Sequence, residues 1–251
     1  MEQLAPILRC PYTGAPVTLA GEHLRAGDRR YPIVDGVPSL VEDGRLSAID
    51  QHFQDQYNDE TARRYDAIIR FQSLLIGCRE STERRKMVDL LAARPGSRVL
   101  EVAAGTGANL PFLSRAVGPA GEIVAVDLSM AMIRVAQRRA RGLGTPVHFV
   151  RADACHLPFA DATFDAVFHF GGLNMFCDVK AALREMVRVA KPGGVIVAGD
   201  EGMSEARRKT WLGRRVGRMN SLNLCRPPFA AVPWDEIQGF QLHWTWRELF
   251  Y

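Results

Sequence analysis

The sequence has few cysteines, no long apolar run and little net charge, and each absence disfavours a class of protein. Its five cysteines are scattered and form no CxxC pair, which disfavours a disulfide framework and indicates a reducing compartment. No apolar run approaches the roughly 20 residues of a membrane span, and the first residues lack a signal-peptide pattern. Basic residues exceed acidic ones by only 32 to 28, so the overall charge does not indicate a nucleic-acid partner. We therefore expect a globular, cytoplasmic protein.

Three regions differ in their residue patterns. Residues 1–45 are rich in proline and glycine and contain short β-prone pieces such as PVTLA and RRYPIVDGVPSLV, which predicts a small β-rich module. Residues 46–94 have helical patterning that ends at ARPGS, because proline and glycine stop a helix. Residues 95–251 alternate short apolar strands with helices. Such alternation predicts an α/β fold, in which helices cover both faces of a doubly wound parallel sheet.

The informative side chains of this third region follow its strands, where parallel sheets bind ligands. In VLEVAAGTGANL, Glu101 precedes a turn with Gly105 and Gly107, and a helix begins near Asn109. The glycines let a ligand approach the backbone, and the helix offers free N–H groups. The spacing is not the GxGxxG of dinucleotide sites, and a carboxylate here suits a cation. The turn therefore indicates a ligand with an ammonium group, the alternative being a plain strand-to-helix connection.

Two further acids follow the next strands. Asp127 ends VAVDLS, where a carboxylate can accept hydrogen bonds from both hydroxyls of a ribose; alternatively it caps the helix that starts near Ser129. In VRADACHLPF, Asp153 is placed to accept from an adenine amine, and the Ala154 N–H to donate to a ring nitrogen. The three strand ends together predict a site for an amine, a ribose and an adenine.

In their order and spacing, VLEVAAGTG, VAVDLS, RADACHLPFADATFDAVF and LREMVRVAKPGG resemble the class I S-adenosylmethionine-dependent methyltransferases, in the small-molecule branch that includes quinone C-methyltransferases. The resemblance covers roughly residues 98–200. It implies a Rossmann-like sheet of seven strands that ends in an antiparallel hairpin, S-adenosylmethionine as methyl donor and S-adenosylhomocysteine as product. The family usually has glycine where this chain has Ala103, so we expect at most a shifted loop and a weaker cofactor affinity.

The resemblance also implies roles for individual residues. Glu101 and the loop from Gly105 to Gly107 would surround the methionine portion, Asp127 the ribose, and Asp153 with Ala154 the adenine. The predicted cofactor site comprises Tyr57, Glu101, Ala103, Gly105, Thr106, Gly107, Asn109, Asp127, Leu128, Met132, Asp153, Ala154 and Phe170.

A lid and an acceptor side are predicted as well. HFQDQYNDETARRYD resembles the helical lid of small-molecule methyltransferases, where a tyrosine closes over the methionine end; Tyr57 is preferred to Tyr65, and the alternative is that both rings only pack the lid. HFGGLNMF follows the fourth strand and supplies His169 and Asn174 as candidates to orient or deprotonate an acceptor. His169 also suits a packed core position, and methyl transfer by in-line displacement can proceed without a base.

The N-terminal module resembles the small zinc-ribbon-like protein that partners some methyltransferases. That fold can carry four cysteines around zinc, whereas only Cys10 is present here and Thr13 stands at a partner position. We therefore expect a degenerate module, residues 1–45, that binds no metal and packs on the main domain.

Near the C-terminus, a basic segment and a last strand are expected. The segment SEARRKTWLGRRVGRMN is a solvated face or a contact for a phosphate, a carboxylate or RNA, through Arg207, Arg208, Arg214 and Arg215. FQLHWTWRELFY alternates as a closing strand, with part of the usual hairpin short or missing, which would leave a sheet edge exposed.

These observations predict an S-adenosylmethionine-dependent methyltransferase that acts on a small, partly apolar molecule. An rRNA or tRNA methyltransferase and a non-catalytic cofactor-binding partner protein remain as alternatives. The acceptor atom and the oligomeric state stay open.

Overall fold

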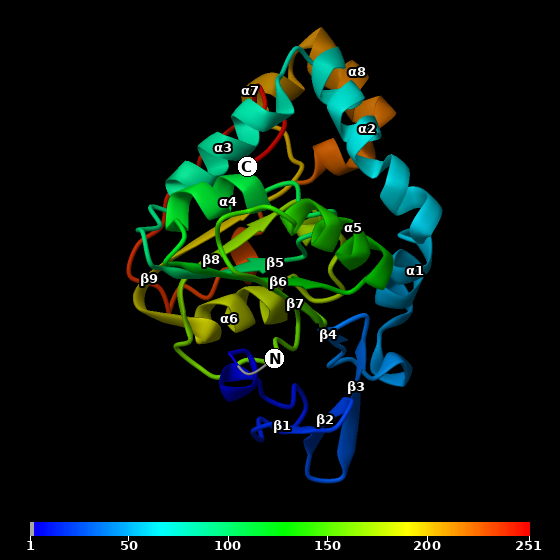
Figure 1. The fold of residues 1–251 in the computed structure, drawn as a ribbon. Helices are drawn as coiled ribbons and strands as arrows, with labels where there is room; N and C mark the ends of the chain where they lie inside the picture. Colours follow the sequence, from blue (N-terminus) through cyan, green and yellow to red (C-terminus); the bar gives the residue numbers. More distant parts are fainter. Residues whose placement is uncertain (1–2) are drawn as a thin grey trace.

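Five parallel strands form the centre of the structure, a computed structural model in which residues 3–251 are described (Figure 1). They are β5 (Arg98–Val102), β6 (Glu122–Asp127), β7 (Val147–Arg151), β8 (Phe164–Phe170) and β9 (Ala190–Gly199). Their order in the sheet is β7-β6-β5-β8-β9. The direction in which strands are added reverses between β5 and β8, and open α/β sheets bind ligands at such a point, beyond the carboxyl ends of the strands.

Helices cover both faces of this sheet, which confirms the predicted α/β architecture (Figure 1). On one face lie α3 (Glu80–Leu90), α4 (Leu110–Val117) and α5 (Met130–Ala140), and on the other lies α6 (Val179–Val189). Side chains alternate along β5, since Val99 packs with the α3–α5 cluster whereas Leu100 and Val102 pack with the α6 cluster. Because the sheet is buried on both faces, its strands read as nearly continuous apolar runs.

The N-terminal module is an antiparallel sheet of β1 (Thr18–Ala20), β2 (His23–Ala26), β3 (Arg29–Val34) and β4 (Val37–Pro38). The chain then runs beside β7: the Leu40 N–H donates to the Arg151 carbonyl at 2.9 Å. The Arg151 side chain donates to Ser39 Oγ at 3.1 Å and to the Leu128 carbonyl at 3.0 Å. Leu24 and Tyr31 of the module belong to the same apolar cluster as α6. The module therefore closes one edge of the central sheet.

The helical segment after this module begins with α1 (Ala48–Gln56) and α2 (Asp59–Leu75). Both helices start at capped positions, where the Ser47 hydroxyl accepts from the Asp50 N–H and the Asn58 amide oxygen accepts from the Thr61 N–H. After β9 come α7 (Glu205–Arg208) and α8 (Trp211–Met219). Single 3-10 turns occupy Ala5–Ile7, Asp43–Arg45, Leu173–Met175, Ser221–Leu224 and Phe229–Ala231. Within residues 3–251, no helix combines the length and apolar character that crossing a bilayer requires.

The prediction of seven strands and of a closing strand at residues 240–251 is wrong for the part of the chain described, where the central sheet has five strands. Trp246, Arg247 and Glu248 have left-handed φ values of 48°, 55° and 67°, so the backbone turns and the Thr245 N–H donates to the Phe250 carbonyl at 3.0 Å. The alternating apolar residues instead serve a cluster in which Trp246 and Phe250 pack on Phe170. As a result, β9 is an edge strand.

Replacing Arg151 by methionine should lower the free energy of unfolding by about 2 to 3 kcal/mol, because Met keeps the apolar stem but leaves buried acceptors on Ser39 and Leu128 without their donor. Urea denaturation measures the loss. Arg30→Met is the matched control, since Arg30 is exposed and lies in the same module; an equal loss in both variants would contradict this account of the docking.

Candidate functional site

A cavity lies beyond the carboxyl ends of β5, β6, β7 and β8, under α1 and α2. Its walls come from the two helices and from the loops that follow the four strands. The residues that line it are Asp50, Phe53, Gln54, Tyr57, Tyr65, Ala103, Gly105, Val126, Asp127, Leu128, Ser129, Met132, Ala152, Asp153, Ala154, Gly171, Gly172, Met175 and Phe176. Eight of the thirteen residues predicted to meet the cofactor line this cavity.

Asp127 organises the loops at the end of β6. Its Oδ2 atom accepts from the Gly105 N–H at 2.7 Å, and its Oδ1 atom accepts from the Ser129 N–H at 2.9 Å. Burial raises the pKa of Asp127, and these backbone hydrogen bonds oppose that rise. The cap of α5 is Ser129, whose hydroxyl accepts from the Met132 N–H at 3.3 Å. Asp127 is therefore free to face the cavity with a carboxylate that the backbone already holds in position.

Glu101 is the most deeply buried acid of the site, with 1% of its surface exposed. Its Oε1 atom accepts from the Asn109 amide at 2.8 Å, and Arg84 donates to the Asn109 oxygen at 3.0 Å. Its Oε2 atom is buried and has no hydrogen-bond partner in the described residues. Burial raises the pKa of Glu101 to about 7, although Asn109 and Arg84 favour the ionised form. An orphaned carboxylate oxygen of this kind fits a ligand that brings a cationic donor, such as an ammonium group.

The turn after β5 keeps the backbone shape of a glycine loop in spite of Ala103. Ala103 has a φ of 51°, in the left-handed region that favours glycine, and it lines the cavity. Gly107 has a φ of 72°, and a Cβ atom there would lie 2.6 Å from Leu110 Cδ1. The contact between the Gly105 N–H and Asp127 is formed, so the local conformation of the loop is maintained at the expense of strain at Ala103.

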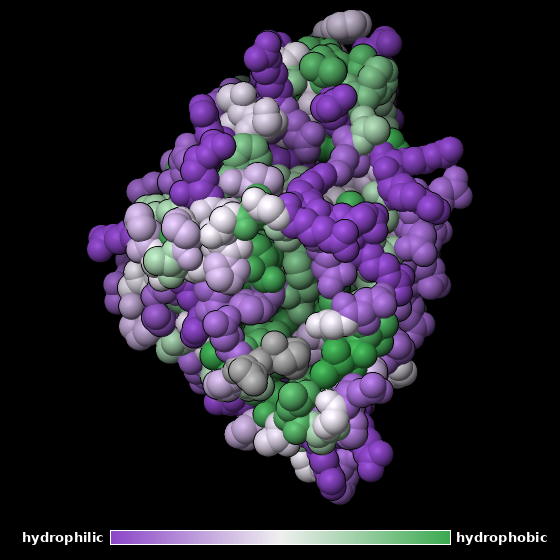
Figure 2. Space-filling model, in the orientation of Figure 1, coloured by the Kyte–Doolittle hydropathy of each residue, from purple (hydrophilic) through white to green (hydrophobic). Residues whose placement is uncertain are grey.

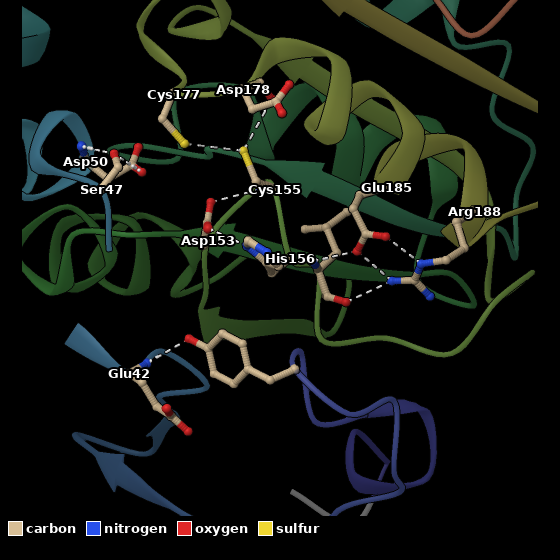
Figure 3. Close-up of polar contacts among 12 residues, drawn as sticks. Glu42, Ser47, Asp50, Asp153, Cys155, His156, Cys177, Asp178, Glu185 and Arg188 are labelled. Atoms are coloured by element: carbon tan, nitrogen blue, oxygen red, sulfur yellow. Dashed lines mark hydrogen bonds and ion pairs between the residues drawn. The ribbon is translucent and has the colours of Figure 1, made fainter. Parts of the chain in front are cut away.

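The loop after β7 contributes Asp153 and Ala154 to the cavity wall, and Figure 3 shows the polar contacts around Asp153. Asp153 accepts from the Cys155 N–H at 2.8 Å, and its other oxygen lies 2.8 Å from His156 Nδ1. Cys155 Sγ lies 3.9 Å from Cys177 Sγ, on the loop that follows β8. Asp153 is thus held rigidly by its own loop, and Ala154 lies beside it in the cavity wall.

The lid contributes two tyrosines to the cavity, both of which were candidates from the sequence. Their rings meet edge to face with centroids 5.9 Å apart, and burial raises the pKa of Tyr57 to about 12. The Tyr57 carbonyl accepts from the Ser129 hydroxyl at 2.7 Å, and the Tyr57 hydroxyl approaches Met175 Sδ at 3.9 Å. The protonated phenol and both rings therefore face the space between the lid and the loop after β8.

A second connection fastens the lid to the glycine turn. Asp66 of α2 accepts from the Thr106 hydroxyl at 2.6 Å and forms an ion pair with Arg139 of α5. Arg139 also donates to Thr106 Oγ1 at 3.3 Å. We call Asp66, Thr106 and Arg139 the lid latch. Sequence patterns did not indicate Asp66 or Arg139, because each lies among other charged residues of an amphipathic helix.

The two candidates for acceptor chemistry lie outside the cavity lining. His169 is fully buried, its Nδ1 atom lies 2.9 Å from the Val102 carbonyl, and burial lowers its pKa. Asn174 donates to the Glu201 carbonyl at 2.7 Å and accepts from the Tyr251 hydroxyl at 3.0 Å. The Asn174 N–H also donates to buried Asp200. In this structure, Asn174 therefore shapes the loop that places Met175 and Phe176 in the cavity wall.

The structure brings together most of the predicted cofactor residues. Those in the cavity lining are Tyr57, Ala103, Gly105, Asp127, Leu128, Met132, Asp153 and Ala154. Those outside it are Glu101, Thr106, Gly107, Asn109 and Phe170. Phe170 differs most from expectation, because its ring packs against Trp246 and Phe250 and lies 5.8 Å from the Arg84 guanidinium. Sequence reasoning identified the lid segment and HFGGLNMF but did not single out the residues of these segments that line the cavity, Phe53, Gln54, Met175 and Phe176.

The assembled groups suit a ligand with a cation, a diol and an aromatic amine. Asp127 supplies a carboxylate for the diol, and the Asp153–Ala154 loop supplies a polar edge for the ring. Glu101 lies just outside the cavity lining and has a buried, unpartnered carboxylate oxygen that suits the cation. Among residues 3–251, no cluster of three or more His, Cys, Asp or Glu side chains is arranged to hold a metal ion. S-adenosylmethionine, which the sequence motifs implied, carries all three of these groups.

Replacing Ala103 by glycine should raise the free energy of unfolding by about 0.5 to 1 kcal/mol, since relief of the left-handed strain outweighs the added freedom of the unfolded chain. The neighbouring Ala104→Gly is the control: Ala104 is buried and is not left-handed, so the same change there should destabilise by about 1 kcal/mol. Equal effects in urea denaturation would contradict the strain.

Glu101→Gln should stabilise the ligand-free protein at pH 8 by about 2 to 3 kcal/mol. The folded pKa is raised to about 7, so the cost of the buried charge is fully present above pH 7 and disappears as the pH falls toward the unfolded value. The gain should therefore be small at pH 5. Thermal or urea unfolding at both pH values measures it, with the exposed Glu22→Gln as control; a gain independent of pH would contradict this reasoning.

Comparison with known proteins agrees with this geometry. A family model described as a methyltransferase domain matches residues 99–194. The demethylmenaquinone methyltransferase of Thermus thermophilus is 39% identical over 55% of this chain and 61% of its own length. The ubiquinone/menaquinone biosynthesis C-methyltransferase UbiE of Ectopseudomonas oleovorans is 34% identical over 68% of this chain and 97% of the relative's sequence.

The match covers only part of the length of most of these relatives. The chain spans 61%, 42% and 64% of the length of the first three curated relatives that it matches. Among solved structures, a chain in the complex of the Haloferax volcanii Trm112 methyltransferase activator with a protein described as a methyltransferase has a TM-score of 0.50 and 19% identity, over 67% of this chain and 69% of that one. That likeness concerns the fold alone. Because the methyltransferase family model matches and the chain covers almost the whole sequence of the Ectopseudomonas oleovorans relative, the chain belongs to the class I S-adenosylmethionine-dependent methyltransferases.

Proposed function

We propose that this protein transfers a methyl group from S-adenosylmethionine to a carbon atom of a small, partly apolar ring compound of the quinone type. The observation that carries the cofactor half of this proposal is the buried, unpartnered Oε2 atom of Glu101, supported by the hydrogen bond that joins the Gly105 turn to Asp127. The acceptor half rests on the apolar walls of the cavity and on the relatives, one named as a demethylmenaquinone methyltransferase and another as a ubiquinone/menaquinone biosynthesis C-methyltransferase.

The proposed cofactor contacts follow the polarity of the cavity. Glu101 would hold the ammonium group, with Asn109 and Arg84 fixing the orientation of its carboxylate. Asp127 would accept from the ribose hydroxyls, while Gly105 and Ser129 keep that carboxylate in place. Asp153 would meet the adenine edge through the rigid loop that it forms with Cys155 and His156.

The acceptor would occupy the apolar end of the cavity, between Phe53 and Tyr65 of the lid and Met175 and Phe176 of the loop after β8. When bound, the cofactor supplies an electrophilic methyl group on a sulfonium, which an acceptor takes by in-line displacement. The protein's own contribution is to exclude water with these side chains and to fix the approach of the acceptor ring.

His169 and Asn174 remain predictions as catalytic residues. Burial lowers the pKa of His169, so its imidazole is neutral near pH 7. Its Nε2 atom has no partner in the described residues, but the same burial disfavours the protonated ring. The His169 ring packs against Phe176, which lines the cavity, with ring centroids 5.1 Å apart. A role in proton transfer would therefore require His169, which does not line the cavity, to gain access to the acceptor.

We also propose that the N-terminal module is a degenerate zinc ribbon that serves as a structural support. Cys10, the one remaining cysteine of that pattern, lies with its Sγ atom 3.1 Å from the Tyr31 hydroxyl in a buried contact. At this distance the Tyr31 hydroxyl and the Cys10 thiol form a hydrogen bond within the apolar core. This supports packing, not metal binding, as the function of Cys10.

The affinity for S-adenosylhomocysteine should fall about tenfold between pH 8 and pH 6. Glu101, with a pKa of about 7 in the ligand-free protein, is mostly ionised at pH 8 and mostly protonated at pH 6, and only the ionised form attracts the ammonium group. Titration calorimetry at both pH values measures the change. Glu101→Gln should bind weakly with no such pH dependence, and Asp127→Ala should lose binding through the ribose contacts.

Turnover tests the acceptor. With radiolabelled S-adenosylmethionine, a short-chain demethylmenaquinone analogue should become labelled in the organic extract, whereas bulk tRNA and rRNA should not. Labelled RNA without labelled quinone would replace the proposed acceptor by nucleic acid. Cofactor binding without label in either fraction would instead favour a non-catalytic partner protein.

A further inference from the structure

Two helices present large apolar side chains to solvent at one end of the molecule. In α2 these are Phe71, Leu74 and Leu75, with 63%, 61% and 64% of their surface exposed, and in α8 they are Trp211 and Met219, with 68% and 72% exposed. Figure 1 places α2 and α8 at the end opposite the N-terminal module, and Figure 2 shows hydrophobic atoms gathered there. We call residues 68–75 and 205–219 the apolar-basic end.

The apolar residues of α8 are not required for its own packing. The helix meets the protein through its glycines, because a Cβ atom at Gly213 would lie 2.0 Å from the Arg207 carbonyl oxygen and one at Gly217 would lie 2.6 Å from Leu224 Cδ2. Trp211 and Met219 lie away from this buried glycine face and are exposed. A helix that packs by glycine and exposes its largest apolar side chains is typical of one that binds something else.

The charge of this end is strongly positive. Arg214, Arg215 and Arg218 of α8 are exposed, and none of them forms an ion pair within residues 3–251. Lys209 is equally exposed and equally without an ion pair, whereas the acid of this segment, Glu205, is paired with Arg226 at 2.8 Å. The Arg215 guanidinium lies 5.8 Å from the Trp211 ring centroid. Exposed apolar groups and unpaired arginines are thus combined on one short helix.

We propose that the apolar-basic end docks on the surface of an anionic lipid bilayer. A basic helix with Trp, Leu and Met on its exposed face matches the acyl boundary with its apolar side chains and the headgroups with its arginines. The aliphatic side chains Leu74, Leu75 and Met219 offer nothing to RNA, whose bases stack on aromatic groups. A second copy of the chain would bring the same unpaired arginines against each other. The charge and the side-chain chemistry of this end therefore favour a lipid surface over RNA and over a second copy of the chain.

The proposal does not depend on the acceptor proposed above, because it concerns binding and not turnover. It does agree with the arrangement of α2, which carries Tyr65 in the cavity wall and Leu75 at the exposed end. The helix therefore connects the cofactor site with the surface proposed to meet the membrane.

Vesicle flotation tests the proposal with the full chain. The protein should float with vesicles of one part phosphatidylglycerol to two parts phosphatidylcholine, remain unbound with phosphatidylcholine alone, and be released as salt is raised. Arg214→Glu combined with Arg215→Glu should weaken binding at least about tenfold, and so should Phe71→Ser combined with Leu75→Ser. Brominated lipid should quench the fluorescence of wild type, and Trp211→Phe should lose most of this quenching.

Matched controls carry the same chemical changes at the other end of the molecule. Arg25→Glu combined with Arg30→Glu, and Leu19→Ser, alter exposed residues of the N-terminal module and should leave flotation unchanged. Retained binding of S-adenosylhomocysteine verifies that each variant is folded. Flotation that is equal in all variants, or absent from wild type, overturns the proposal. Salt-sensitive RNA binding, or a dimer lost on mutation of Phe71 or Trp211, without flotation would assign the surface to RNA or to a second copy.

Discussion

The cost of burying the Glu101 carboxylate is the constraint on which the site depends. An acid with almost no exposed surface is stable as a charge only when its oxygens are satisfied, and here one oxygen has Asn109 while the other has no partner in the described residues. Arg84 acts through the Asn109 amide and does not contact the acid directly. The ligand-free protein therefore tolerates a group that would be more stable protonated, and a cationic ligand removes that conflict. In the proposed function, this one unsatisfied atom is the source of the selectivity for an ammonium-bearing cofactor.

The parts of the site that could be predicted from sequence are those whose residues directly follow a predicted strand. Each parallel strand ends at the same edge of the sheet, so the acids in VLEVAAG, VAVDLS and VRADAC had to come together once the strands were identified. Asp127 and Asp153 line the cavity for this reason. The left-handed conformation of Ala103 was equally accessible, since a family position usually held by glycine implies a backbone that glycine suits.

Other parts depend on contacts between distant segments, which periodicity does not encode. The lid latch joins Asp66 and Arg139, 73 residues apart, and each looks like an ordinary charge on a helix surface. Phe176 lies in the wall because Asp200 and Asn174 hold the preceding loop. The alternation of FQLHWTWRELFY suggested a strand, but Glu83 binds the Thr245 hydroxyl and the Trp246 N–H, which stabilises a left-handed turn. Tertiary contacts with α3 thus override a local preference.

Helix α2 reaches from the cavity to the exposed apolar-basic end, and this arrangement has a thermodynamic consequence. Tyr65 lies on the cavity while Leu75 lies nearly three helical turns further on, and the lid latch at Asp66 ties the helix to the glycine turn. If the helix takes different positions with and without cofactor, any partner that prefers one position at its exposed end must change the affinity for cofactor, and cofactor must change the affinity for that partner by the same factor. One continuous helix would then be sufficient for reciprocal allosteric coupling, without a separate regulatory domain.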